Sequence, residues 1–393
     1  MRLTAITFYT MKLFSKYKIL GALLIAMCFF ACKKDKISVT PPEPVAPPVV
    51  VNWGKAADDA QVALDVQFYN NTQNYYNQNN DGHLGFNYWW NAHALDVHID
   101  AYKRTKDARY LIKMKALLNG CYVKNGNTFK NTFYDDMEWW ALACLRAYDA
   151  TGDIEYKQAA DQLWAWIKVG WTTVKNGGIM WTSGSPDSKN ACSNAPAAII
   201  AARMYQLDKK ADDLVWAKKI YTWMKAYVVE PARGVVWDAY GNTSEGALYT
   251  YNQGTWLGAG LELYLITKEQ SYLDDAVRNA NYVMNDAVKF SPNGILKGEN
   301  SGDGGLFKGI YIRYMAQLLL KNVVDDYTKE LYLKYLKQNG QSLYTKAIRT
   351  PENIFGSDWA TKPSAKVGDC SVQLSGVMLF ETLDELKRAG ILK

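Results

Sequence analysis

The sequence predicts an all-α, single-domain protein in which about twelve helices pair into six hairpins and close into a ring, an (α/α)6 toroid. Two observations lead to this prediction. Apolar residues recur at intervals of three and four through most of the chain, whereas strand-like alternation is scarce. A short motif also recurs with constant internal spacing, which indicates stacked supersecondary units. An open helical solenoid is the alternative that the same pattern allows.

The repeated motif marks the turn inside each hairpin. It contains a Tyr, a Thr three residues later, an acidic residue two positions further on and a second Tyr, and it occupies 102–110, 148–156 and 264–272. An apolar helix leads into the first Tyr, and a second helix begins just before the second Tyr. A fourth, eroded copy begins at Tyr205. We therefore expect each unit to be a helical hairpin.

The helical period and these turns place the helices in order along the chain. Each Thr-x-acid turn separates two helices of one hairpin, and the eroded copy separates the pair near 190–228. The best strand candidates are the short stretches 177–181 and 234–237. The expected helices span 56–79, 88–104, 107–122, 135–150, 154–170, 190–206, 212–228, 252–266, 270–288, 304–320, 326–346 and 370–389.

Residues 1–31 are predicted to be an export signal rather than part of the fold. Three lysines precede an apolar run over 19–31 that is too short to span a bilayer comfortably as a mature helix. Cys32 follows the small Ala31 and precedes a polar stretch, which resembles a bacterial lipoprotein signal, although Phe29 stands where Leu is usual. Cys28 competes as the lipidation site, and we choose Cys32.

Residues 32–52 are predicted to be a lipidated tether, because five prolines between 41 and 48 favour a stiff, extended chain. No second proline-rich linker follows, so residues 53–393 form one domain, which we expect to be monomeric. We expect the protein outside the cytoplasm, anchored by lipid to the outer membrane. The sequence does not distinguish its periplasmic face from the cell surface.

Composition indicates a globular chain and excludes several classes of site. Hydrophobic residues make up 49% of it, and the net charge of +6 is partly in the signal and otherwise scattered, which gives nucleic-acid binding no support. The cysteines after the signal lack metal-ligand spacing, and we expect buried thiols in preference to disulfides. These cysteines are Cys121, Cys144, Cys192 and Cys370.

Metal, phosphate and thiol chemistry are not supported by the remaining motifs. His83, His93 and His98 have no zinc-ligand spacing, and the latter two are predicted to be hydrogen-bonded helix residues. The glycine-rich stretch 302–305 lacks the residues of a phosphate or calcium loop, so we expect a flexible turn before a helix. No His lies within sequence reach of Cys192 to activate a nucleophilic thiol. We expect no metal or organic cofactor.

Chemistry is expected at one mouth of the ring. In an up-down ring every inner helix enters from the same face, so six helix starts converge. Amide, hydroxyl and aromatic groups together suit sugars, whose hydroxyls need directional hydrogen bonds and whose C–H faces stack on rings. Such groups at the expected helix starts include Trp89, Trp90, Asn91, His93, Asp135, Asp136, Lys189, Asn190, Asn194, Tyr251, Asn252, Gln253, Trp256, Phe307, Lys308 and Asp369.

The adjacent carboxylates Asp135 and Asp136 are the strongest catalytic candidates. Two carboxylates in one helical turn repel each other, so one ionises readily and the other holds its proton, which yields a nucleophile and an acid. Retaining glycosidases need the two groups about 5–5.5 Å apart, a distance that neighbouring side chains can span. The competing interpretation is a capping box formed by Asp135 and Glu138.

These residues and several later motifs resemble glycoside hydrolase family 76, which comprises endo-acting α-1,6-mannanases and their fungal wall-modifying relatives. The likeness covers most of the chain after the tether. Two departures are Met137, where Gln is common, and Gln253, where a small residue is common. The matching stretches are Tyr134-Asp135-Asp136 with 140–143, 178–181, 189–194, 236–238, 250–254 and 307–310 with Arg313.

The resemblance implies an (α/α)6 fold and hydrolysis of α-mannan with retention, with Asp135 as nucleophile and Asp136 as acid/base. It also implies that Trp90 and Trp181 stack on sugar, although core packing is the alternative for both. The residues implied to hold mannose units are Asn190, Asn194, Asp238, Tyr251, Asn252 and Lys308. Helix caps, a turn and an ion pair are the structural alternatives for these polar residues.

Two other functions remain open at this point. A non-catalytic mannan-binding surface lipoprotein would share the signal, the tether and the aromatic content. A transglycosylase on the same fold would transfer mannan to a sugar acceptor instead of water.

Overall fold

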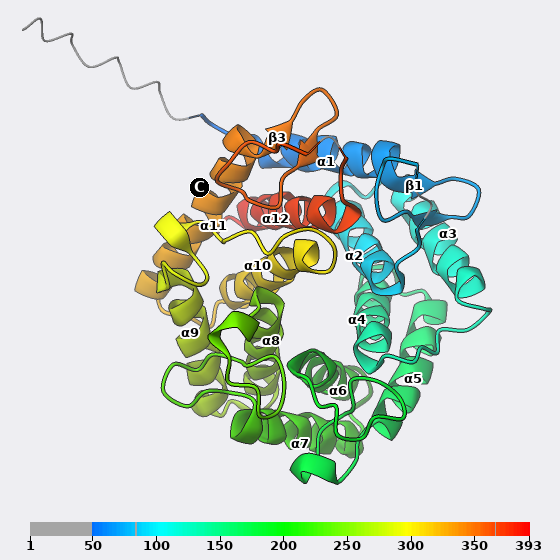
Figure 1. The fold of residues 1–393 in the computed structure, drawn as a ribbon, viewed down its shortest axis with the longest axis vertical. Coiled ribbons are helices and arrows are strands. Elements are labelled where there is room, and N and C mark those ends of the chain that lie inside the picture. Colours follow the sequence, from blue (N-terminus) through cyan, green and yellow to red (C-terminus); the bar gives the residue numbers. More distant parts are fainter. Residues whose placement is uncertain (1–48, 83–84, 366) are drawn as a thin grey trace, which may run out of the picture. The chain divides into compact units, whose positions relative to one another are not determined.

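The computed structural model describes residues 49–82, 85–365 and 367–393. The predicted signal, the lipidation site at Cys32 and the tether up to residue 48 lie outside these residues. In the described part, residues 49–393 form two concentric rings of helices (Figure 1). The inner helices are α2 (Tyr88–Thr105), α4 (Tyr134–Thr151), α6 (Ala195–Asp208), α8 (Thr250–Thr267), α10 (Gly304–Leu320) and α12 (Cys370–Arg388). The outer helices are α1 (Trp53–Phe68), α3 (Ala108–Lys124), α5 (Ile154–Val169), α7 (Ala211–Tyr227), α9 (Gln270–Asn285) and α11 (Asp326–Lys346).

The inner ring closes on itself. Each inner helix contacts the next, from α2 through α4, α6, α8 and α10 to α12, and α12 in turn contacts α2 (Figure 1). The outer helices α3, α5, α7 and α9 each pack on the inner helix that precedes them, and α1 packs on α12. The predicted (α/α)6 toroid is therefore confirmed, and the open solenoid is not observed.

The repeated motif forms the turn of a hairpin, as predicted. Lys106 ends α2 in the left-handed conformation with φ 57°, and its N–H donates to the carbonyl of Tyr102 at 2.8 Å. The Thr105 hydroxyl accepts from the N–H of Asp107 at 3.1 Å, and Asp107 caps α3 by accepting from the N–H of Arg109. The 148–156 copy repeats all of these contacts, whereas Glu269 of the third copy makes no side-chain cap.

Ten of the predicted helices start and end within a few residues of their expected bounds, and two differ more. Helix α1 ends at Phe68 instead of 79, because Asn70 turns the chain by accepting from the N–H groups of Thr72 and Gln73. Helix α6 starts at 195 instead of 190, after the 3₁₀ turn η2 (Ala191–Ser193). Three further 3₁₀ turns are η1 (Val174–Asn176), η3 (Glu245–Ala247) and η4 (Pro292–Gly294).

Sheet structure is minimal among the described residues. β1 (Tyr69–Asn70) pairs antiparallel with β2 (Tyr75–Tyr76), and β3 (Ile348–Arg349) pairs likewise with β4 (Ile354–Phe355). The strand candidates 177–181 and 234–237 form only single bridges, Trp171 with Ile179 and Val229 with Val236. They are parts of the long loops that precede inner helices.

The inner helices make the core. Every residue from 252 to 263 in α8 and from 370 to 384 in α12 is buried. Close approach needs glycine, since a Cβ at Gly254 would lie 2.6 Å from the Cα of Tyr311, and one at Gly309 would lie 2.7 Å from the Cα of Ser375. Although these helices are apolar, none in the described part is long and apolar enough to cross a membrane.

Buried amide side chains fasten the loops over the inner-helix starts. Asn194 accepts from the N–H of Ile179 at 2.8 Å and donates to the carbonyl of the same residue at 3.0 Å. Gln253 makes the same two-way contact with Val236, at 2.8 Å in both directions. Asn91, Asn339 and Gln373 make similar contacts with neighbouring loops. These contacts satisfy buried backbone groups and hold the loops that surround the mouth.

Candidate active site

The helix starts enclose an open cleft of about 800 Å³ at the mouth of the ring. Its walls come from the starts of four inner helices, α2, α4, α8 and α10, and from the loops before these helices and before α6. The convergence expected of an up-down ring is thus observed. The lining residues are Phe86, Asn87, Tyr88, Trp89, Phe133, Asp135, Asp136, Trp139, Trp181, Asn190, Cys192, Asp238, Tyr249, Tyr251, Glu299, Asp303, Gly304 and Phe307.

Asp135 and Asp136 lie in the first turn of α4 and face this cleft. Their side chains are partly exposed, whereas the helix around them is buried from Met137 to Leu145. The N-cap residue is Phe133, which makes no side-chain capping bond, and Glu138 is fully buried. The capping-box interpretation of Asp135 and Glu138 is therefore not observed.

Several donors favour the ionised form of Asp135. The indole Nε1 of Trp181 donates to its Oδ2 at 3.1 Å, and the Cys192 thiol and backbone N–H groups at the start of α4 also act on the carboxylate. Burial in the cleft is the larger effect and raises the pKa of Asp135 to about 6, while these hydrogen bonds limit the rise. Asp135 is thus mostly ionised at neutral pH.

The surroundings of Asp136 favour its protonated form instead. Burial raises its pKa well above the usual range, and the negative charges of Asp135 and then Asp303 raise it further. Among the described residues, no Lys or Arg lines the cleft, which carries five carboxyl groups. Asp136 therefore holds its proton while Asp135 is charged. The pair can supply a carboxylate and a carboxylic acid at the same pH.

Aromatic rings form two walls of the cleft. Trp181 is 37% exposed, and its ring lies 4.9 Å from that of Phe133, between centroids. On another side, Tyr251 of α8 stacks on Phe307 of α10 with a centroid distance of 4.0 Å and an angle of 10°. Such faces can bind the C–H surface of a sugar.

Polar groups between these walls can orient hydroxyls. Asn190 and Asp238 both line the cleft, on two loops joined by the hydrogen bond from the N–H of Ala191 to the carbonyl of Asp238 at 2.8 Å. Asn252 lies behind them, fully buried, and its Nδ2 donates to Oδ1 of Asp238 at 3.2 Å. Burial raises the pKa of Asp238, and this hydrogen bond opposes the rise.

Four of the implied sugar-binding residues do not line the cleft. Trp90 is 5% exposed and donates from Nε1 to Asp303 at 2.9 Å. Asn194 clamps Ile179, and Asn252 contacts Asp238 instead of the open space. Lys308 is buried, with its ammonium 4.0 Å from the ring centroid of Trp359 and hydrogen-bonded to the carbonyl of Ser357. These four residues position neighbours in this structure, and their contact with sugar stays a prediction.

Several residues that line the cleft were not predicted to do so. Cys192 approaches Asp135, and Glu299 accepts from the N–H of Thr250 at 3.0 Å, at the start of α8. Asp303 belongs to the stretch 302–305, which we expected to be a flexible turn. The turn does precede α10, but Gly304 and Gly305 are packed against neighbouring atoms, whereas Gly302 faces open space. Only their positions before inner helices could have indicated these residues.

The histidines and thiols show one departure from expectation. His98 shares a hydrogen bond of 2.6 Å with the Tyr76 hydroxyl, as expected of a helix residue. His93 is buried between Trp89 and Trp139, and its Nδ1 lies 3.6 Å from Oδ2 of Asp96, which is too long for a hydrogen bond. The four cysteines predicted to be buried thiols are all buried and free.

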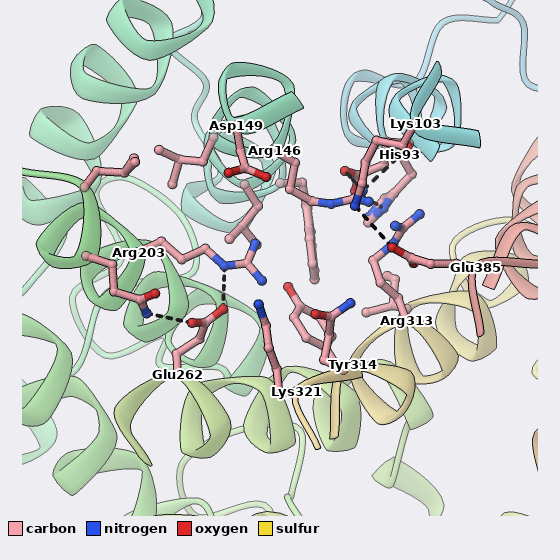
Figure 2. A pocket seen from close by; sticks show the side chains of 18 residues that line it. His93, Lys103, Arg146, Asp149, Arg203, Glu262, Arg313, Tyr314, Lys321 and Glu385 are labelled. Carbon is pink, nitrogen blue, oxygen red and sulfur yellow. Dashed lines mark hydrogen bonds and ion pairs between the residues drawn. The ribbon is translucent and has the colours of Figure 1, made fainter. Parts of the chain in front are cut away.

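A second cavity, of about 240 Å³, lies on the far side of Trp139, at the C-terminal half of the inner helices. Figure 2 shows ionic side chains from several inner helices pointing into it. Arg203 of α6 binds Glu262 of α8 at 2.7 Å, and Lys103 of α2 binds Glu385 of α12 at 3.2 Å. Trp139 lines both cavities and forms a floor between them.

Comparison with known proteins places this geometry in a family. Residues 53–390 match the family model described as glycosyl hydrolase family 76. The chain belongs to glycosyl hydrolase family 76. The resemblance found in the sequence motifs is thereby confirmed, and the solved structures of the family share the toroid.

Two solved structures and one curated relative illustrate the likeness. An α-1,6-mannanase from Salegentibacter sp. HEL1_6 is 44% identical, with a TM-score of 0.82, over 85% of this chain and 100% of that chain. An inactive variant of that enzyme, with two consecutive aspartates replaced by asparagine, is in complex with α-1,6-mannotriose. It is 43% identical, with a TM-score of 0.82 and the same coverage. A mannan endo-1,6-alpha-mannosidase of Candida albicans is 25% identical over 166 residues, which span 37% of this chain and 36% of the relative.

Proposed function

We propose that this family 76 protein hydrolyses internal α-1,6-mannosidic bonds of mannan by double displacement, with retention at the anomeric carbon. The observation that carries the proposal is the unequal environment of two adjacent carboxyl groups in an open cleft: the indole of Trp181 donates to Asp135, whereas Asp136 has no hydrogen bond to a described residue and faces the carboxyl groups of Asp135 and Asp303. The Salegentibacter variant supports it, because replacement of two consecutive aspartates accompanies loss of activity in that enzyme.

In the first step, a carboxylate oxygen of Asp135 forms a bond to the anomeric carbon as the glycosidic C–O bond breaks. Asp136 donates its proton to the departing oxygen. In the second step, ionised Asp136 takes a proton from water, whose oxygen attacks the anomeric carbon while the ester bond to Asp135 breaks. Asp135 is then a carboxylate again, and Asp136 is protonated for the next cycle.

The cleft walls supply the sugar-binding surface in this proposal. Trp181, Asn190, Asp238 and Tyr251 line the cleft, and we propose that they contact mannose units through stacking and hydroxyl hydrogen bonds. The open cleft suits a polymer that binds at an internal position of its chain.

Incubation with linear α-1,6-mannan, followed by chromatography of the products, tests the proposal. We expect a series of oligosaccharides from wild type and none from a variant with Asp135→Asn and Asp136→Asn, which should still be retained on a mannan gel. No release by wild type, with unchanged gel retention by the variant, would favour a binding protein. Larger products formed only with excess acceptor would favour a transglycosylase.

We further propose that the enzyme is exported and anchored by lipid at Cys32, which rests on the signal and the proline-rich tether alone. Expression in a bacterium with lipoprotein processing should place wild type and Cys28→Ala in the membrane fraction. Cys32→Ala should appear in the soluble fraction. Membrane retention of Cys32→Ala would contradict this assignment.

A further inference from the structure

Asp303 is held in the cleft by hydrogen bonds and by the packing of Gly304, although it takes no part in the steps above. It is the N-cap residue of α10 but makes no side-chain capping bond. Close packing fixes the backbone around it, because a Cβ at Gly304 would lie 1.8 Å from the carbonyl oxygen of Glu299. The N–H of Gly302 also donates to Oδ2 of Asp369 at 3.1 Å.

Two indoles converge on one oxygen of this carboxylate. Nε1 of Trp89 lies 3.1 Å from Oδ1 of Asp303, and Nε1 of Trp90 lies 2.9 Å from the same atom. Both tryptophans belong to the first turn of α2, across the mouth from α10. Oδ2 has no hydrogen bond to any described residue, and the side chain is exposed to the cleft. The indoles fix the group while its charge stays available to the site.

No Lys, Arg or His among the residues that the structure describes lines the cleft to offset that charge. Asp136 faces Asp135 on its own helix, and Glu138 lies buried below them. The titratable groups that line the cleft from other elements are Tyr88 of α2, Cys192 before α6, Asp238, Tyr249 and Tyr251 around α8, and Glu299 and Asp303 before α10. Of these, Asp303 is the one outside α4 whose negative charge acts on the Asp136 carboxyl and favours its protonated form.

We propose that Asp303 is a positioning residue of the reaction: its carboxylate, fixed by two indoles in the cleft that Asp136 also lines, acts on the Asp136 carboxyl in both steps of the catalytic cycle. This rests on the proposed double displacement. Asp135 loses its charge when it becomes an ester, so it ceases to help Asp136 bind a proton at the step in which Asp136 must take one from water. Asp303 forms no bond to the sugar in either step, so its carboxyl group stays beside the site and maintains the proton affinity of Asp136.

Titration of the Asp136 carboxyl tests this inference without substrate. Carbon-13 NMR of labelled aspartate carboxyls, with Asp136→Asn for assignment, would follow wild type, Asp303→Asn, Asp303→Ala and Asp303→Glu. We expect the Asp136 transition to move to lower pH by about half a unit in the first two variants and to return towards wild type in the third. The basic limb of kcat/KM on mannan should move in the same direction. Asp212→Asn, an equal charge change on the exposed face of α7, should leave both unchanged.

The outcomes separate this inference from the proposed function. Unchanged Asp136 titration in both charge-removing variants would overturn it, even if activity or the melting temperature fell, because a merely structural Asp303 would give that result. A shifted titration in a protein that releases no oligosaccharide would instead support the electrostatic role and reject the mannanase proposal.

Discussion

At the scale of single residues, neighbours decide the roles of two identical side chains. Asp135 receives hydrogen bonds from an indole, a thiol and the helix start, whereas Asp136 has no hydrogen bond to a described residue and faces two negative charges. The paired acids could be predicted because they are adjacent in sequence. Asp303 could not, since it lies more than 160 positions away and only the ring brings it into the cleft.

Replacement of Asp136 by asparagine should affect substrates according to their leaving group. We expect Asp136→Asn to lower kcat on mannan by roughly 10²–10⁴-fold, because a sugar oxygen leaves poorly without a proton. With an aryl mannoside that has an acidic phenol as leaving group, the rate of the first step should fall much less. This step is observed as a burst of released phenol. Asp212→Asn is the matched control. Full turnover of mannan by Asp136→Asn would exclude the acid role.

The hydrogen bond from Trp181 should set part of the pH dependence. Because Asp135 must be ionised, kcat/KM should rise as the pH passes through about 6 in wild type. Trp181→Phe keeps a ring against Phe133 but removes the donor, which destabilises the carboxylate and raises its pKa. The acidic limb should therefore move to higher pH by roughly half a unit to one unit.

A control for this variant is Trp223→Phe, which loses an indole hydrogen bond to Lys175 outside the cleft. Its acidic limb should match that of wild type. A limb that stays in place in Trp181→Phe would show that the indole does not act on the nucleophile.

At the scale of elements, the helical period and the Thr-x-acid turns were sufficient to predict twelve helices. The end of α1 was missed, because its apolar spacing continues past Phe68 while Asn70 stops the helix through its own side chain. The loops before α6 and α8 have little periodicity of their own. Their conformation depends on Asn194 and Gln253, whose partners are distant in sequence.

The hydrogen bonds of the buried Asn194 side chain to Ile179 and Asn190, here called the amide clamp, should contribute strongly to the stability of the fold. Asn194→Ala removes bonds to the N–H and carbonyl of Ile179 and to the carbonyl of Asn190, at 2.8, 3.0 and 2.8 Å. Leaving these buried groups unpaired should lower the free energy of unfolding by roughly 2–4 kcal/mol, measured by urea denaturation. Asn285→Ala, which loses one exposed bond, should change it little. Equal effects of the two variants would argue against the clamp.

At the scale of the whole molecule, ring closure explains why the carboxyl groups of the cleft lie at one end of the ring and the ion pairs at the other. The repeats predicted the closed ring and its converging helix starts. The ionic network of the second cavity was not predictable, because its partners lie on different inner helices. Arg146 of α4 binds Asp96 and Asp100 of α2, and Arg313 of α10 binds Asp100 at 2.8 Å.

Loss of Arg146 should destabilise the ring. Burial opposes ionisation of Asp96, but Arg146 and then Arg313 outweigh it and lower its pKa. Arg146→Met removes one of the arginine partners of this buried carboxylate. The free energy of unfolding should therefore fall by roughly 3–5 kcal/mol near neutral pH. Arg109→Met, an exposed control, should keep the wild-type denaturation midpoint.

The pH dependence of that loss follows from the sign of the shift. A carboxylate with a lowered folded-state pKa stabilises the fold above its unfolded pKa of about 4, and this contribution disappears as the pH falls through the folded value. The difference between wild type and Arg146→Met should therefore shrink in acid. A difference that is absent at neutral pH would show that the network is dispensable.

The most direct test of the central claim, that Asp135 attacks while Asp136 protonates, is the anomeric configuration of the first product. Proton NMR within the first minutes of mannan hydrolysis resolves α and β reducing ends before they interconvert. Double displacement predicts that the α anomer appears first. An initial β anomer would mean a single displacement by water and would contradict Asp135 as the nucleophile.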